Sequence, residues 1–171
     1  MWRWQQVAAW LDKPQRGAEL GVKEGRFTSY ILDRFPELHM IAVDTWRVKP
    51  PLDLQGYETY KGWNFEAIQQ EFSNVTQQFA NRLTVMVMDT VSAAQLVPNA
   101  SLDFVFIDAE HTYDAVLADI RSWSSKVKSG GLLCGHDYCH KFPGVKKAVD
   151  DSFGHVDIMA GDNDTWAVRV D

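Results

Sequence analysis

Five acidic residues each stand at the end of a short apolar run, and they are Glu19, Asp44, Asp89, Asp108 and Asp137. If these runs are parallel strands, their carboxyl ends meet at one edge of a sheet, where ligands bind in open α/β folds. One such acid alone is commonly a helix N-cap, but five together indicate a shared polar site. Carboxylates in this position can bind a cationic ligand, accept a proton or ligate a metal ion.

A glycine turn within residues 17–29 joins a strand-like run to a helix. Gly21 and Gly25 allow a sharp bend and a close approach to a ligand, and the N–H groups of the following helix face the strand end. A dinucleotide fingerprint would carry a middle glycine where Lys23 stands. Glu19 would also repel a pyrophosphate and attract an ammonium or sulfonium group. The turn therefore favours a cationic cofactor, with an ordinary strand-to-helix loop as the alternative.

Strands and helices alternate along the chain, which predicts a doubly wound, Rossmann-like α/β fold with a mostly parallel sheet. Apolar runs predict strands over 17–21, 40–44, 83–89, 102–108 and 132–137. Helical spacing predicts a cap helix over about 2–12 and further helices over 28–35, 64–80, 115–128 and 145–153. A closing hairpin of 156–160 and 165–170 adds an antiparallel strand at one edge.

Residues 45–64 interrupt this alternation with two prolines and four aromatic side chains. Loops of this length inside a compact domain are commonly functional or disordered, and the aromatic residues argue against disorder. We therefore expect a lid or insertion that contributes to a binding site.

The composition indicates one soluble domain over residues 1–171, with 46% hydrophobic and 23% charged residues. A net charge of −6 argues against nucleic acid as a partner. We expect a cytoplasmic protein without a membrane partner, because no apolar run is long enough to span a bilayer. Cys134 and Cys139 are the only cysteines, and their spacing predicts two free thiols.

Four segments together resemble the class I S-adenosylmethionine-dependent methyltransferases, and they read ELGVKEG, IAVD, DFVFIDAEHTY and GGLLCGHDY. The sequence is most similar to the small-molecule O-methyltransferase branch, methyltransferase family 24, which includes macrolide-sugar and rhamnosyl O-methyltransferases. The resemblance covers nearly the whole chain except the cap helix and the lid. It implies the strand order 3-2-1-4-5-7-6.

The resemblance also implies S-adenosylmethionine as the cofactor. Glu19 and the turn from Gly21 to Gly25 would hold its methionine part, and Asp44 would bind both ribose hydroxyls. Asp89 and the backbone of Thr90 would lie at the adenine edge. The implied cofactor-binding set is Glu19, Gly21, Gly25, Asp44, Thr45, Asp89, Thr90 and Asp108.

Methyl transfer from a sulfonium requires an aligned nucleophile and an acceptor for its proton. His111 lies just past the fourth strand and would serve as that base, with a helix-capping role as the alternative. By the resemblance, Asp108, His136 and Asp137 would hold a divalent ion. His136 stands where metal-dependent relatives carry an acid, which favours manganese over magnesium. The predicted catalytic set is His111, Asp108, His136 and Asp137.

Two functions stay open at this point. The first is methylation of a hydroxyl on a small, sugar-like molecule, and the second is non-catalytic binding of S-adenosylmethionine or S-adenosylhomocysteine. A nicotinamide-dependent dehydrogenase is disfavoured by Lys23 and Glu19. Whether the chain forms a homo-oligomer is left open by its sequence.

Overall fold

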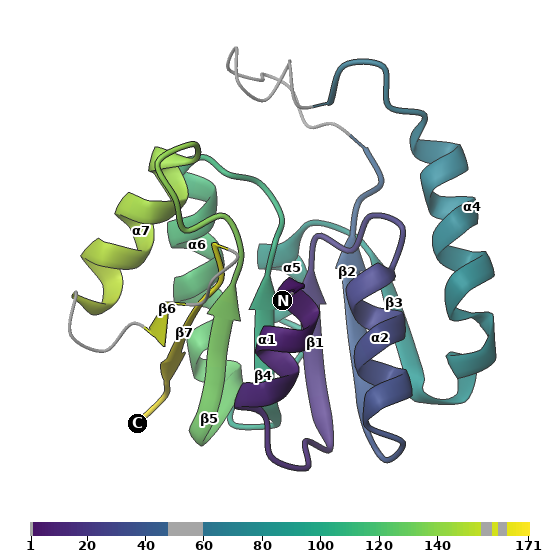
Figure 1. Cartoon of the computed structure of the whole chain (residues 1–171), viewed down its shortest axis with the longest axis horizontal. Helices are drawn as coiled ribbons and strands as arrows, with labels where there is room; N and C mark the ends of the chain where they lie inside the picture. The colour runs from purple at the N-terminus through teal and green to yellow at the C-terminus, as the bar shows by residue number, and fades with distance from the viewer. Residues whose placement is uncertain (1, 48–59, 155–158, 161–163) are drawn as a thin grey trace.

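A seven-stranded sheet forms the centre of the protein in a computed structural model that describes residues 2–47, 60–154, 159–160 and 164–171 (Figure 1). The strands are β1 (Arg16–Leu20), β2 (His39–Asp44), β3 (Leu83–Val87), β4 (Leu102–Ile107), β5 (Val127–Gly135), β6 (Met159–Ala160) and β7 (Trp166–Arg169). Their order is β3-β2-β1-β4-β5-β7-β6. Strands β1 to β5 pair parallel with one another, and β7 pairs antiparallel with β5 and β6. The predicted fold class and strand order are confirmed.

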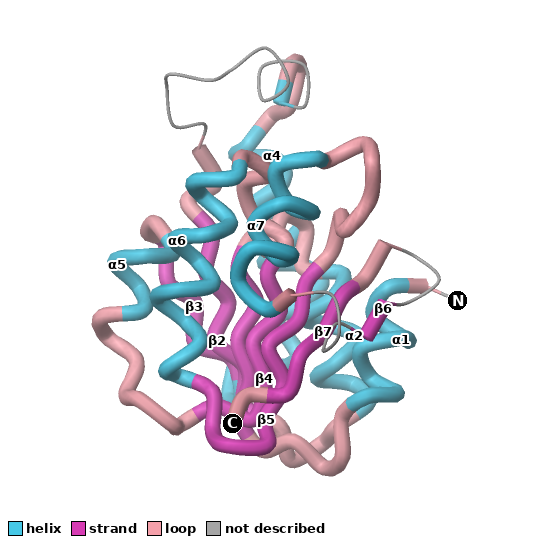
Figure 2. The backbone as a smooth tube through the Cα atoms, turned by 90° about the vertical axis from the view of Figure 1, so that its left-hand side faces the viewer, coloured by secondary structure: helices cyan, strands magenta, loops and turns pink. Residues whose placement is uncertain are grey.

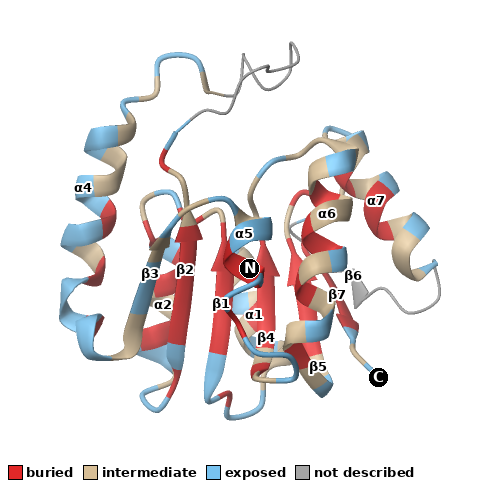
Figure 3. Ribbon diagram, turned by 180° about the vertical axis from the view of Figure 1, so that it is seen from behind, coloured by how far each residue is buried: buried red, intermediate tan, exposed pale blue. Residues whose placement is uncertain are grey.

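Helices cover both faces of this sheet, as the side view in Figure 2 shows. They are α1 (Arg3–Trp10), α2 (Arg26–Arg34), α4 (Phe65–Thr76), α5 (Thr90–Ala94), α6 (Tyr113–Trp123) and α7 (Pro143–Phe153). One core lies between the sheet and α5, α6 and α7, and a second core lies between the sheet and α1 and α2. The central strands are buried on both sides (Figure 3), which explains their continuous apolar runs.

The start and end of α2 follow from local chemistry. Gly25 takes a left-handed conformation with φ of 77° directly before the helix, which a glycine adopts without strain. Phe27, Ile31 and Leu32 then recur on one face and are buried. The helix ends before Phe35, because the following Pro36 disfavours helical geometry at the residue that precedes it.

The predicted helix over 115–128 is wrong at its C-terminal end, and the strand predicted over 132–137 begins earlier than expected. The α-helix stops at Trp123, a 3-10 turn covers Ser124–Lys126, and β5 begins at Val127. The pairing of β4 with β5 shifts its register between Leu102 and Phe104, so the glycines lie in a bulge inside the strand. A Cβ on Gly131 would lie 2.9 Å from the Asp103 carbonyl oxygen, which explains the glycine there.

Two other boundaries differ from the sequence predictions. The helix predicted to reach residue 80 ends as an α-helix at Thr76, whose hydroxyl donates to the Phe72 carbonyl oxygen at 2.7 Å, and a 3-10 helix follows over Gln77–Arg82. β3 ends at Val87 rather than at 89. Most of the predicted lid and most of the first hairpin strand, at 48–59 and 155–158, lie outside the described residues. No helix of the described part is long and apolar enough to span a bilayer.

Candidate active site

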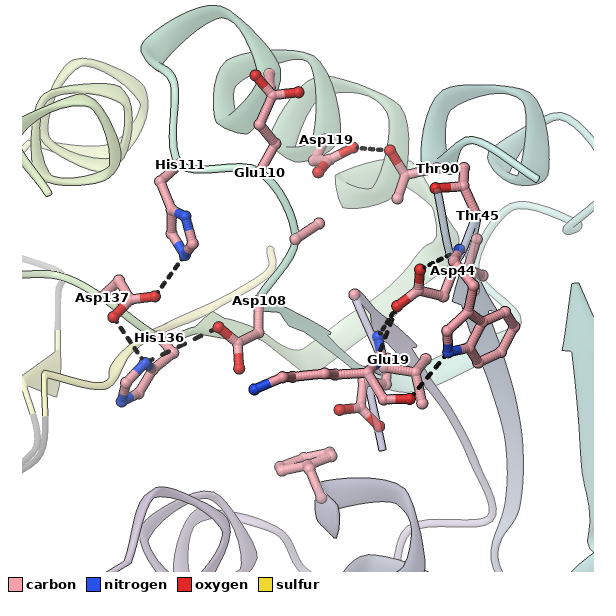
Figure 4. Close-up of a pocket in the computed structure, with 18 of the residues that line it drawn as sticks. Glu19, Asp44, Thr45, Thr90, Asp108, Glu110, His111, Asp119, His136 and Asp137 are labelled. Carbon is pink, nitrogen blue, oxygen red and sulfur yellow. Dashed lines mark hydrogen bonds and ion pairs between the residues drawn. The ribbon is translucent and has the colours of Figure 1, made fainter. Parts of the chain in front are cut away.

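A cavity of about 1000 Å³ opens above the carboxyl ends of the strands. Its wall includes most of the predicted site residues together with residues of α1 and α6, and Figure 4 shows ten of them labelled. This is the edge of the sheet at which open α/β folds bind ligands.

The glycine turn after β1 supports one side of the cavity. Gly21 lines it with φ of 82°, and a Cβ there would lie 2.2 Å from the Asp108 carbonyl oxygen. Gly25 instead faces α4, where a Cβ would lie 2.7 Å from a ring carbon of Phe72. Both glycines are therefore required by backbone conformation, as the sequence predicted, and also by close protein packing, which the sequence did not indicate.

Glu19 lies at the floor of the cavity with only 2% of its surface exposed, and it accepts a hydrogen bond from the Thr28 hydroxyl. Burial raises the pKa of Glu19 well above its usual value, and the hydrogen bond from Thr28 only partly opposes this. A cation placed beside Glu19 would restore its negative charge, so the residue suits an ammonium group.

Asp44 ties together the loops that follow β1 and β2. Its Oδ2 accepts hydrogen bonds from the backbone N–H of Val22 at 2.8 Å and of Lys23 at 2.9 Å, and its Oδ1 accepts one from Trp46 at 2.7 Å. The sequence predicted a ribose contact for Asp44 but not this structural role. Thr45, next to it, exchanges hydrogen bonds with the backbone of Arg47.

Asp89 and Thr90 lie beyond the end of β3, where Asp89 caps α5 by accepting a hydrogen bond from the Ser92 N–H at 2.9 Å. Thr90 accepts a bond at its carbonyl oxygen from the Trp123 indole N–H at 3.0 Å, and its hydroxyl donates to Asp119. Asp119 is a buried cavity residue that the sequence analysis missed. It lies in the middle of a helix, where an acid gives no signal of a site.

The predicted catalytic residues form one cluster of charges at the ends of β4 and β5 (Figure 4). His111 Nε2 lies 2.7 Å from Asp137 Oδ2, and His136 Nδ1 lies 3.0 Å from Asp137 Oδ1. Asp108 Oδ1 is 3.9 Å from the same nitrogen of His136. Asp137 therefore lies between the two imidazoles and can orient both.

The charges in this cluster shift each other's pKa values. Burial acts to raise the pKa of Asp137, but its contacts with His111 and His136 outweigh burial and hold it well below the usual range. Burial acts to lower the pKa of His136, but Asp137 and Asp108 raise it overall. Burial raises the pKa of Asp108 to about 6, although Arg3 and the histidines oppose it. Asp108 therefore releases its proton at a higher pH than an ordinary carboxyl group, whereas Asp137 stays ionised.

Helix α1 contributes a wall of the cavity that the sequence analysis described only as a cap helix. Arg3 Nη2 lies 3.3 Å from Asp108 Oδ2, and its Nε is buried without a hydrogen-bond partner among the described residues. Trp2 and Trp4 also line the cavity, and their rings stack at 5.2 Å between centroids. No sequence signal marked Arg3, because its position depends on how α1 packs against α2.

Aromatic side chains at the end of the predicted lid line the cavity opposite α1. Tyr60, Trp63 and Phe65 pack against each other with ring centroids 5.3 to 6.2 Å apart. The Lys23 ammonium group lies 4.2 Å from the centre of a Trp63 ring, within the range of a cation–π contact.

The donor atoms at the charge cluster fit a divalent metal ion. One ligand atom from each of Asp108, His111 and Asp137 can be chosen so that all three lie within 4.8 Å of one another. This set contains His111 where the sequence analysis predicted His136. His136 Nδ1 is nevertheless buried without a well-directed hydrogen bond and faces the same two acids. Two carboxylates and an imidazole suit manganese better than magnesium.

Comparisons with known proteins identify the family and support the fold. A family model described as a methyltransferase domain matches residues 18–138. Because this match spans most of the chain, the protein belongs to that family. Together with the fold, it defines an S-adenosylmethionine-dependent methyltransferase of class I. A comparison with proteins of curated function finds no match.

Two solved structures illustrate the shared fold. A TDP-rhamnose 3'-O-methyltransferase of calicheamicin biosynthesis is 14% identical, with a TM-score of 0.63, over 97% of this chain and 76% of that one. The 1,6-didemethyltoxoflavin-N1-methyltransferase of Burkholderia thailandensis, with bound substrate and S-adenosylhomocysteine, is 15% identical, with a TM-score of 0.62, over 98% and 76%. At these identities the likeness establishes the fold alone.

Proposed function

We propose that this protein transfers the methyl group of S-adenosylmethionine to a hydroxyl of a small, sugar-like molecule. The observation that carries the proposal is the 2.7 Å contact between His111 Nε2 and Asp137 Oδ2 in the same cavity as Glu19 and Asp44. This contact joins a base to the acid that orients it, beside side chains suited to a cationic cofactor. Similar structures include an O-methyltransferase and an N-methyltransferase, and the former acts on a sugar.

The cofactor would be held by residues already in place. Glu19 would accept the ammonium group of its methionine part, next to Gly21. Asp44 would accept the ribose hydroxyls, because each carboxylate oxygen can accept more than one hydrogen bond. Thr45, Asp89 and Thr90 would border the ribose and adenine. When bound, S-adenosylmethionine supplies an activated methyl group.

His111 would act as the general base of the reaction. Its Nε2 faces Asp137, which fixes the tautomer and leaves Nδ1 to accept the proton of the substrate hydroxyl. The ring stacks on Phe142 with centroids 4.4 Å apart, which restricts its orientation. Asp137 stabilises the imidazolium that forms.

A divalent ion would be held by Asp108 and Asp137, with His111 or His136 as the nitrogen ligand. It would lower the pKa of the substrate hydroxyl. If His111 held the ion, that residue would serve as a ligand and no longer as the general base. Manganese is the ion we expect, because an imidazole belongs to either ligand set.

The test combines a binding measurement with a turnover measurement. We expect S-adenosylhomocysteine to bind the wild-type protein in calorimetric titration, and labelled methyl from S-adenosylmethionine to transfer to a TDP-sugar, with and without manganese. His111→Gln should lower turnover by roughly 10²- to 10⁴-fold and leave S-adenosylhomocysteine affinity unchanged.

His140→Gln is the matched control, because His140 is exposed on the loop after β5. It should match the wild-type protein in both measurements. If the wild-type protein binds no S-adenosylhomocysteine, the proposed function is wrong.

One observation favours the alternative, a protein that binds the cofactor or its product without catalysis. The Arg3 guanidinium lies on Asp108 and supplies a positive charge where a metal ion would bind. Binding of S-adenosylhomocysteine together with no methyl transfer to any hydroxyl acceptor, with or without manganese, would support that alternative.

A further inference from the structure

Asp119 is a buried carboxyl group in the cavity wall that the predicted chemistry does not use. It lies on the Thr90 side of the cavity, whereas the histidines lie on the other side (Figure 4). Only 2% of its surface is exposed. Ala115 and Ala118 lie on the same face of α6 and also line the cavity, so the two small side chains leave room next to the carboxyl group.

Asp119 has no cationic partner among the described residues. Its one side-chain hydrogen bond comes from the Thr90 hydroxyl to Oδ1. Its pKa is raised to about 7, mainly by burial; the hydrogen bond from Thr90 opposes this shift, and the nearby charges of Glu110 and Asp89 add to it. A buried acid without a counter-charge costs stability, so a ligand contact is a physical reason for its presence.

We propose that Asp119 accepts a hydrogen bond from the exocyclic amino group of the cofactor's adenine and so selects adenine over hypoxanthine. This inference rests on the proposed function, because it requires an adenosyl cofactor in the cavity. Thr90 holds the carboxyl group in place through Oδ1, which leaves Oδ2 to meet the ligand. Asp89 is less suited to this role, because its carboxylate already caps α5.

The different hydrogen-bonding groups of adenine and hypoxanthine explain why Asp119 would favour adenine. Adenine presents an amino group, which donates a hydrogen bond, at the position where hypoxanthine presents a carbonyl oxygen, which accepts one. A carboxylate accepts only, so it pairs with adenine and repels hypoxanthine. A buried polar group left unpaired is costly, and sites built on such a bond reject the analogue that lacks it.

The test is calorimetric titration with S-adenosylhomocysteine and with S-inosylhomocysteine at pH 8.5, where Asp119 is ionised. The wild-type protein should prefer the adenosyl compound by about tenfold or more. Asp119→Asn should reduce this preference at least about fivefold, because its amide can also donate to the hypoxanthine oxygen. An unchanged preference in Asp119→Asn would overturn the assignment.

Asp114→Asn is the matched control, because Asp114 is an exposed acid on the same helix and is not part of the cavity wall. It should keep the wild-type preference. Thermal melting separates recognition from a structural role. Asp119→Asn keeps an acceptor for Thr90 and removes a buried charge, so its melting temperature should not fall.

A lower melting temperature of Asp119→Asn with equal loss of both ligands would mean a structural role and overturn the proposal. If the wild-type protein binds neither S-adenosylhomocysteine nor S-inosylhomocysteine, the proposed function is wrong, and so is the proposed adenine contact. If the wild-type protein binds both equally, only the assignment of Asp119 is wrong. The failure of this inference is thus distinguishable from failure of the proposed function.

Discussion

The two sides of the cavity are held in different ways. On the side formed by the loops after β1 and β2, Asp44 is fixed by three backbone N–H groups. On the side formed by the loops after β4 and β5, Asp137 is fixed by the side chains of His111 and His136. Backbone bonds do not depend on pH near neutrality, whereas imidazole contacts do. The first side is therefore a permanent support and the second is a site whose charge can change.

The largest expected effect is on the second side. Asp137→Asn should lower turnover by roughly 10²- to 10⁴-fold, because one amide cannot accept from both histidines and the orientation of His111 is lost. The fold should survive, since Asp137 has φ of 61° and asparagine tolerates this conformation. Single-turnover rates of the two proteins check this prediction.

Affinity for S-adenosylhomocysteine is the control for Asp137→Asn and should stay within about twofold of the wild-type value. A large loss of that affinity would mean that both sides of the cavity hold the cofactor. The proposed division into a cofactor-binding side and a catalytic side would then be wrong.

A smaller effect is expected on the first side. Asp44→Ala should weaken S-adenosylhomocysteine binding by about 2 kcal/mol, roughly 30-fold, because the proposed charge-assisted hydrogen bonds to the ribose would be lost. It should also destabilise the fold, because three backbone N–H groups lose their acceptor. Calorimetry and denaturant unfolding measure the two effects separately. Unchanged affinity would leave Asp44 with a structural role only.

The smallest effect concerns stability and pH. Asp119 has a usual pKa of 3.8 and a folded-state pKa of about 7, so the folded state binds its proton more tightly. The protein therefore loses stability as pH rises from about 4 to about 7, and it does not recover above 7. Asp119→Asn lacks this loss, so it should be more stable than the wild-type protein at pH 8 by about 2 kcal/mol.

Urea unfolding of the wild-type and Asp119→Asn proteins at pH 4 and pH 8 checks this prediction. The difference between them should shrink toward pH 4. An equal difference at both pH values would mean that the charge of Asp119 is not the cause.

The sequence predicted the centre of the sheet well, because β2 and β4 each contain a continuous apolar run that ends in or is followed by an acid. The same reasoning brought Asp108 and Asp137 to one edge, because strand ends meet there in any doubly wound fold. Prediction from the sequence failed between α6 and the middle of β5. The bulge at Gly130 and Gly131 depends on the register between β4 and β5. Register is a property of paired strands and cannot be read from one of them.

The residues missed at the site have a common physical cause. Arg3 contacts Asp108 only because α1 packs against α2. This packing is a contact between two helix surfaces and leaves no motif in the sequence. Asp119 meets Thr90 across 29 positions of sequence. The order of the strands indicates where loops gather, but the direction of a side chain on a helix depends on tertiary packing.

The stacked pair of Trp2 and Trp4 gives the protein an optical signature. Two indoles with centroids 5.2 Å apart and planes 6° apart couple their electronic transitions. The contribution of this pair to the near-ultraviolet circular dichroism would report the coupling without any attached label. The signal would vanish on Trp2→Ala substitution, so the spectrum can follow the first residues of the chain while a ligand enters the cavity beside them.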